Sequence, residues 1–142
     1  MTFLKTDNAS RGSIRRYERL NRTLYNCNAS IYFNKQCLRK RLTPSYAKIK
    51  IPNNSPAPKY TLQKITNLRI KDEIKYLHSK KQRLNQQLYQ LHLHLAHTWN
   101  HIWPYIQRTI EEKLQRATRN KYKSFNKKLE YLSQTQTKTP HE

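Results

Sequence analysis

The fold is decided by residues 69–99, RIKDEIKYLHSKKQRLNQQLYQLHLHLAHTW, in which apolar residues recur at alternating spacings of four and three. The seam extends to residue 102 and consists of Ile70, Ile74, Leu77, Leu84, Leu88, Leu91, Leu95 and Ile102, with Lys81 and Thr98 as polar exceptions. A heptad pattern of this length without Gly or Pro predicts one long amphipathic helix. Because a helix cannot bury its own apolar stripe, the seam must pair with another helix of the chain or of a partner. The residues we assign to a possible partner interface or to self-association are Leu84, Leu88, Leu91, Leu95 and Trp99.

A second helix is expected beyond Pro104. The proline ring clashes with the carbonyl of Asn100 and removes one backbone hydrogen bond, so a kink or a break is predicted near 101–103. Apolar residues then recur at helical spacing, at Ile106, Ile110, Leu114, Ala117, Phe125, Leu129 and Leu132. The predicted fold class is therefore all-α, either a helical hairpin or, if Pro104 only kinks the helix, one bent rod that favours a coiled coil.

The N-terminal part of the chain is basic and less regular. We expect a disordered leader over residues 1–12 and a basic N-terminal region over 13–58, helical in part because Ile14, Tyr17 and Leu24 share one helical face. Alternation of apolar residues and lysines over 47–51 predicts a short extended arm. The prolines at 52, 56 and 58 predict a linker before the helical region, 59–132, and the polar tail 133–142 is expected to be disordered.

Positive charge is the strongest compositional signal. The 142 residues contain 29 Lys and Arg against 8 acids, a formal net charge of +21, and no acid occurs between Glu18 and Asp72. Uninterrupted positive charge binds nucleic-acid backbones because neutralised phosphates release counterions, and interleaved aromatic rings stack on unpaired bases. We predict electrostatic binding of RNA or single-stranded DNA; the predicted contacts are Arg39, Lys40, Arg41, Lys48 and Lys50, with Tyr46 as a stacking ring. The alternatives are a solvated basic surface without a ligand, and a helical assembly protein of a ribonucleoprotein such as a ribosome, acting through the leucine seam.

The sequence contains no recognisable catalytic constellation. His94, His97 and His101 would share one helical face, and two histidines four residues apart bind zinc in metalloproteases. Here the stretch HTWNH has no general-base Glu, and no carboxylate occurs between Glu73 and Glu111. We therefore predict no metal, no cofactor and no enzymatic activity. The histidines are interpreted as flanking the apolar seam, with Trp99 and Trp103 as core or interface residues near the bend.

Cysteine usage and hydropathy indicate the compartment. Cys27 and Cys37 form neither a disulfide framework nor a CxxC metal motif, so a reducing, intracellular compartment is expected, the nucleus or the cytoplasm. Five arginines in the first 26 residues also leave a mitochondrial location open. The longest stretch without formal charge, 84–107, is rich in Gln, His and Asn, so no membrane span is predicted.

Part of the chain resembles a known class of retroelement. Residues 35–113 look similar to the region upstream of the reverse transcriptase domain in Penelope-like reading frames. The matching features are Cys37-Leu38, Thr43-Pro44, Lys48-Ile49-Lys50, Arg69-Ile70-Lys71 and the leucine-rich run that ends at Trp99. The resemblance implies a basic, helical accessory piece that helps a larger polymerase hold its template. This sequence lacks the aspartate-containing polymerase motif and the GIY-YIG nuclease motif of such elements, so no catalytic residue is carried over. The chain is expected to be a fragment of a larger reading frame or an accessory protein.

Overall fold

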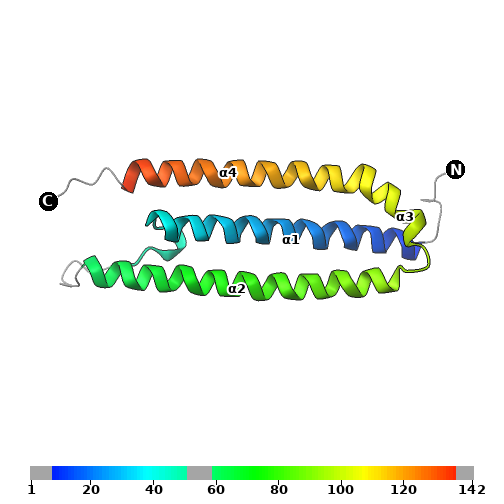
Figure 1. Ribbon diagram of the computed structural model, residues 1–142, viewed down its shortest axis with the longest axis horizontal. Helices are drawn as coiled ribbons and strands as arrows, with labels where there is room; N and C mark the ends of the chain where they lie inside the picture. Colours follow the sequence, from blue (N-terminus) through cyan, green and yellow to red (C-terminus); the bar gives the residue numbers. More distant parts are fainter. Residues whose placement is uncertain (1–7, 51–58, 137–142) are drawn as a thin grey trace.

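The computed structural model describes residues 8–50 and 59–136, and these residues form helices and short connections without a strand. Three long helices lie side by side: α1 (Asn8–Lys40), α2 (Lys59–His94) and α4 (Glu112–Gln136). Figure 1 shows α1 in the middle, antiparallel to α2 on one side and parallel to α4 on the other. This arrangement confirms the predicted all-α fold class.

α1 remains helical over 33 residues because it packs against a helix on each side. Toward α4, the rings of Phe33 and Phe125 stack with their centroids 4.8 Å apart. Toward α2, the Cys27 thiol donates a hydrogen bond to the carbonyl of Leu77 at 3.1 Å. The central helix therefore buries more of its circumference than a helix at the edge of a bundle.

Buried asparagines do not interrupt α1, because their amides bond to the helix itself. The Asn21 Nδ2 donates to the carbonyl of Tyr17 at 3.1 Å, and the Asn34 Nδ2 donates to the carbonyl of Ser30 at 2.8 Å. A buried amide that finds a partner costs little, so the polar residues fit the packed helix.

The N-terminal region is more helical than predicted. α1 begins at Asn8, within the segment 1–12 predicted to be disordered, and continues to Lys40, so the extended arm is confined to the connection after it. In that connection, Ser45–Ala47 forms a single 3-10 turn, η2, flanked by extended backbone at Pro44 and Lys48. The reason is tertiary: in the second half of α1, Tyr32 and Phe33 pack against Tyr122 and Phe125 of α4. Residues 1–7, the proline linker 51–58 and the end of the tail, 137–142, lie outside the described residues, whereas 133–136 belong to α4.

The leucine seam of α2 is buried as its spacing predicts. Its members from Leu77 to Leu95 are at most 9% exposed and form one core with residues of α1 and of the segment 102–114. The other members of that core on α1 and beyond α2 are Ile14, Tyr17, Leu20, Cys27, Ile31, Ile102, Ile106, Ile110 and Leu114. A second core at the opposite end contains Phe33, Cys37, Leu42, Ala47, Ile70 and Leu129. The seam therefore finds its partner helix within the chain.

The chain reverses at residues 95–98, before the predicted position near Pro104. α2 ends at His94, and the amide of Thr98 donates to the carbonyl of Leu95 at 3.0 Å. The carbonyl of Thr98 then accepts the amides of His101 and Ile102, both at 3.0 Å, which begins the next helix. Leu95, the first residue of this turn, and Ile102, which follows it, are both buried, so the seven-residue spacing of buried residues is kept although the helix is not continuous.

Pro104 lies inside a helix and does not end it. It belongs to α3 (Trp99–Tyr105), which continues through a π-helical turn, η3 (Ile106–Glu111), into α4. Proline cannot donate to the carbonyl four residues before it, and π-turns commonly occur where the regular ladder is interrupted. The break predicted near 101–103 is absent, since these residues belong to α3, and a π-turn begins instead at Ile106. α3, η3 and α4 follow one another without interruption and are called the third rod.

α1 ends in a Schellman motif whose left-handed position is occupied by Arg41. The amide of Leu42 donates to the carbonyl of Cys37 at 2.9 Å, and the amide of Arg41 donates to the carbonyl of Leu38 at 3.3 Å. Arg41 has a φ of 56°, a conformation that costs a residue with a Cβ more than it costs glycine.

Replacing Arg41 by Gly is therefore expected to raise the free energy of unfolding by about 1 kcal/mol. The matched control is Lys40→Gly, which also removes one cation but lies at the last residue of α1, outside the left-handed region, so glycine is not expected to stabilise the protein there. Urea unfolding of both variants checks the prediction, and an Arg41→Gly protein no more stable than the wild type would contradict it.

Candidate nucleic-acid interface

The positive charge of the described chain lies on its surface. From Arg11 to Lys128, every Lys and Arg side chain whose exposure is described is exposed, except Lys80 and Lys81, which are half-buried. Glu18 accepts a hydrogen bond from Arg22 at 2.7 Å and forms an ion pair with Lys113 at 3.7 Å. Since 29 cations face 8 acids, most of the cations cannot be neutralised within the chain.

Lys40, one of the predicted contacts, lies together with cations of α4. It lines a hollow of about 500 Å³ with Lys123 and Lys127, and Glu130 is the acid among the lining residues. The parallel course of α1 and α4 produces this cluster, because it brings the C-terminal parts of both helices to the same end of the molecule (Figure 1). Arg39 and Arg41 flank Lys40 and are exposed.

Tyr46 and Lys48 lie on the other side of α1, against α2. The Tyr46 hydroxyl donates to Oδ1 of Asn34, and the carbonyl of Lys48 accepts the Arg69 guanidinium at 3.4 Å. Burial, together with the charge of Glu73, raises the pKa of Tyr46 to about 12. The hollow beside Tyr46 is lined by Arg69, Asp72, Glu73 and Tyr76.

The predicted contact set is therefore divided between two places. The Tyr46 hollow contains two carboxylates, which repel phosphate, so the stacking role predicted for Tyr46 has poor electrostatic support. Lys50, at the end of the described segment 8–50, is exposed. The Lys40 cluster is the part of the predicted set that the fold reinforces with further cations.

A face of α1 carries arginines that the predicted contact set leaves out. Arg11, Arg15 and Arg19 follow one another at spacings of four and are exposed. Residues four apart are neighbours on a helix surface, so these guanidinium groups share one face. The four-residue spacing is the sequence signal for this face.

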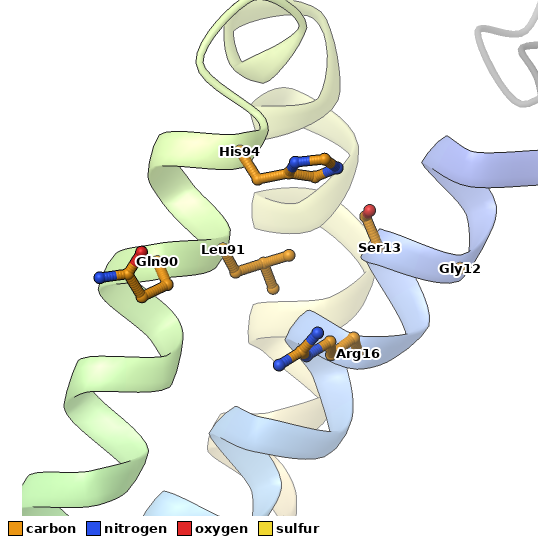
Figure 2. A pocket seen from close by; sticks show the side chains of 6 residues that line it. All are labelled: Gly12, Ser13, Arg16, Gln90, Leu91 and His94. Atoms are coloured by element: carbon orange, nitrogen blue, oxygen red, sulfur yellow. The ribbon is translucent and has the colours of Figure 1, made fainter.

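A groove between α1 and α2 forms the other notable concavity. One hollow, of about 560 Å³, is lined by Gly12, Ser13, Arg16, Gln90, Leu91 and His94. In Figure 2 Arg16 extends from α1 toward α2, the His94 ring points toward Ser13, and Leu91 lies between them. A second hollow, of about 730 Å³, shares Arg16 and Gln90 and is also lined by Arg83, Asn85, Gln86, Gln87 and Tyr89. None of these described lining residues is acidic.

The histidines do not form the helical stripe that their spacing suggests. His94 is the last residue of α2, His97 lies in the turn, and His101 belongs to α3, and all three are exposed. Residues 8–50 and 59–136 contain no group of three His, Cys, Asp or Glu side chains that could hold a metal ion.

The aromatic residues near the turn form a packed cluster at the end of the bundle. The ring of Trp99 lies 5.7 Å from that of Tyr17, 4.2 Å from that of His92 and 5.3 Å from that of Trp103, measured between centroids. Burial lowers the pKa of His92. Trp99 thus contributes to intramolecular packing, which is the first of the two roles, core or interface, that the sequence left open for the tryptophans.

Both cysteines are buried inside α1. Burial raises the pKa of Cys37 to about 11 and also raises that of Cys27, so both thiols are held in their protonated form at neutral pH. Thiolates are the nucleophiles and metal ligands, and these positions therefore serve packing.

The structure contradicts the assignment of the leucine seam to a partner interface. Leu84, Leu88, Leu91 and Leu95 are between 5% and 9% exposed, and Trp99 is half-buried, because α1 covers them. The spacing could not show whether the covering helix belongs to the same chain or to another protein, because either helix would bury the apolar seam of α2.

Comparisons with protein-family models, with curated proteins and with solved structures give no match to this chain. Within the described ranges no helix combines the length and the apolar character that crossing a membrane requires. The candidate interface therefore rests on the charges and contacts of the chain itself.

Proposed function

We propose that the chain is a non-enzymatic protein that binds RNA or single-stranded DNA, mainly by electrostatic attraction. The observation that carries the proposal is the exposure of nearly every described Lys and Arg side chain on a chain with 29 cations and 8 acids. A surface of this kind repels itself, and a polyanion that releases counterions on binding offsets the repulsion. The resemblance to the template-holding region of Penelope-like reading frames supports the same function.

The Lys40 cluster is the surface that we assign to the nucleic-acid backbone. Lys40, Lys123 and Lys127 come from two helices and converge on one hollow, so a single phosphodiester segment can contact all three. Lysine is a point charge on a flexible stem, which suits contacts that follow the backbone without reading the sequence.

Binding to labelled single-stranded RNA across a salt series tests this function. For single strands, the logarithm of the binding constant falls with the logarithm of the salt concentration by about 0.7 for each neutralised phosphate. Changing Lys40, Lys123 and Lys127 together to Ala is expected to make this slope shallower by about 2 and to weaken binding at low salt by tenfold or more.

The matched control changes the same three lysines to Arg, which keeps the charges, and it should retain the wild-type slope. Absence of binding by the wild-type protein at low salt would refute the proposed function. A wild-type slope in the Ala variant would place the phosphate contacts elsewhere on the surface.

The alternative function, an assembly protein of a ribonucleoprotein that acts through its leucine seam, finds less support. Its proposed contact residues are occupied by α1 and are not offered to another chain. The described exposed apolar side chains of α2, among them Leu68, Tyr76, Tyr89 and Leu93, do not belong to the seam.

A further inference from the structure

We propose that the groove between α1 and α2 binds a segment of a single nucleic-acid strand and contacts its bases as well as its backbone. This inference rests on the proposed function and deepens it, because electrostatic attraction alone does not distinguish one base from another. The groove comprises the two adjoining hollows that share Arg16 and Gln90.

Two arginines supply the phosphate contact. Arg16 from α1 and Arg83 from α2 line the same hollow, and both side chains are exposed. A guanidinium group presents paired N–H donors that match two phosphate oxygens. Because no described residue lining either hollow is acidic, an anion in the groove meets no carboxylate there.

Glutamine amides supply the groups that recognise base edges. Gln86, Gln87 and Gln90 lie beside the arginines along one side of α2. An amide offers both a donor and an acceptor, which is the combination that hydrogen-bonds to the edge of a nucleobase. Electrostatic attraction to a basic surface involves only its cations and gives no role to three amides within one hollow. A groove that contacts bases would use these amides for hydrogen bonds.

Tyr89 provides an aromatic ring at the edge of the same hollow. Its side chain is 62% exposed, although burying a tyrosine ring is normally favourable. An exposed ring beside cations and amides is the arrangement on which unpaired bases stack, which favours a single strand over a duplex.

The length of the groove fits a short strand. From Arg83 to His94 the helix rises about 17 Å, and stacked nucleotides advance about 3.4 Å each along a strand, so a few nucleotides fill it. At the far end Gly12 has no side chain, and nothing lies within 4 Å of the place where its Cβ would be, so the strand can approach the backbone of α1 closely.

The experiment compares two pairs of arginine substitutions on the full chain. Arg16→Gln with Arg83→Gln changes the groove, and Arg116→Gln with Arg119→Gln removes the same charge from exposed positions of α4. The ligands are three fluorescent single-stranded RNA oligomers, of uridine, adenosine and cytidine, each about twelve nucleotides long. The corresponding single-stranded DNA oligomers of the same length are measured beside them. We expect the groove pair to lose at least about tenfold in affinity and the α4 pair at most about threefold.

A third variant, Gln86→Leu with Gln90→Leu, tests the base contacts without changing the charge. It is expected to keep the wild-type salt slope while the affinities for the three RNA oligomers become equal. Thermal unfolding of each variant checks that the helices remain intact, which the exposure of all these side chains favours.

The outcomes separate this inference from the proposed function. Equal losses in the two arginine pairs, or equal affinities of the wild-type protein for all three RNA oligomers, would refute the groove while leaving electrostatic binding intact. Failure of the wild-type protein to bind any oligomer at low salt would refute both. Comparison of the RNA and DNA oligomers shows which sugar the groove accepts.

Discussion

Replacing Leu84 by Ala is expected to lower the free energy of unfolding by about 2–5 kcal/mol. Leu84 is 8% exposed and lies in the core that joins α1, α2 and the rod formed by α3, η3 and α4. The substitution removes buried methyl groups and leaves a cavity that packed helices cannot fully close. A loss of this size is a large part of the stability of a small domain, so the midpoint of urea unfolding should fall clearly.

The matched control is Leu68→Ala on the same helix. Leu68 is 53% exposed, so its truncation is expected to change the free energy of unfolding by less than about 0.5 kcal/mol. If Leu84→Ala left the stability of a monomer unchanged but dissociated an oligomer, the seam would belong to a partner interface, and the intramolecular packing described above would be wrong.

The heptad seam shows how far the sequence predicts the fold. Spacing alone identified the buried apolar residues of α2 and the apolar face of α1 at Ile14, Tyr17 and Leu24, because helical periodicity reports which residues share a face. Spacing could not identify the turn at 95–98, because this segment contains neither glycine nor proline. The heptad spacing also continues across the turn, from buried Leu95 to buried Ile102. Pro104 was the stronger local signal, yet the helix accommodates it with a π-turn.

The candidate interface is less visible in the sequence than the core. Runs of cations such as Arg39 to Arg41 are evident, but the cluster of Lys40 with Lys123 and Lys127 joins residues more than eighty positions apart. The carboxylates beside Tyr46 also come from another part of the sequence, because Asp72 and Glu73 reach it only through the packing of η2 on α2. Surface charges impose no periodicity of their own, so their grouping follows from the tertiary arrangement.

The stability of the protein is expected to fall between pH 10 and pH 12 by about 2 kcal/mol more than that of a Tyr17→Phe variant. Tyr17 is 5% exposed, and its burial, followed by the charge of Glu111, raises its pKa from 10.0 to about 12. The hydroxyl lies 3.4 Å from Oε1 of Glu111. The ionised ring would be both desolvated and repelled by the carboxylate.

The sign follows from the protons bound in each state. Below pH 10 the tyrosine is protonated in the folded and the unfolded chain, so its full contribution is present. Between pH 10 and pH 12 the unfolded chain releases the proton while the folded chain retains it, and stability declines as the pH rises. Neutralisation of lysines in the same range reduces self-repulsion, but this effect is common to both proteins and cancels in their difference.

Urea unfolding of both proteins at closely spaced pH values measures this difference. The phenyl ring of the Tyr17→Phe variant would keep the contacts with Trp99 and His92 and cannot ionise. Its curve therefore contains the contributions of the lysines, the cysteines and the other tyrosines, which the wild-type curve shares. Parallel curves would show that Tyr17 ionises equally in the folded and unfolded chains, which requires its hydroxyl to be open to water. A wild-type curve that falls more steeply than that of the variant places the hydroxyl inside the aromatic cluster beside Glu111, where it links α1 to the π-turn that follows Pro104.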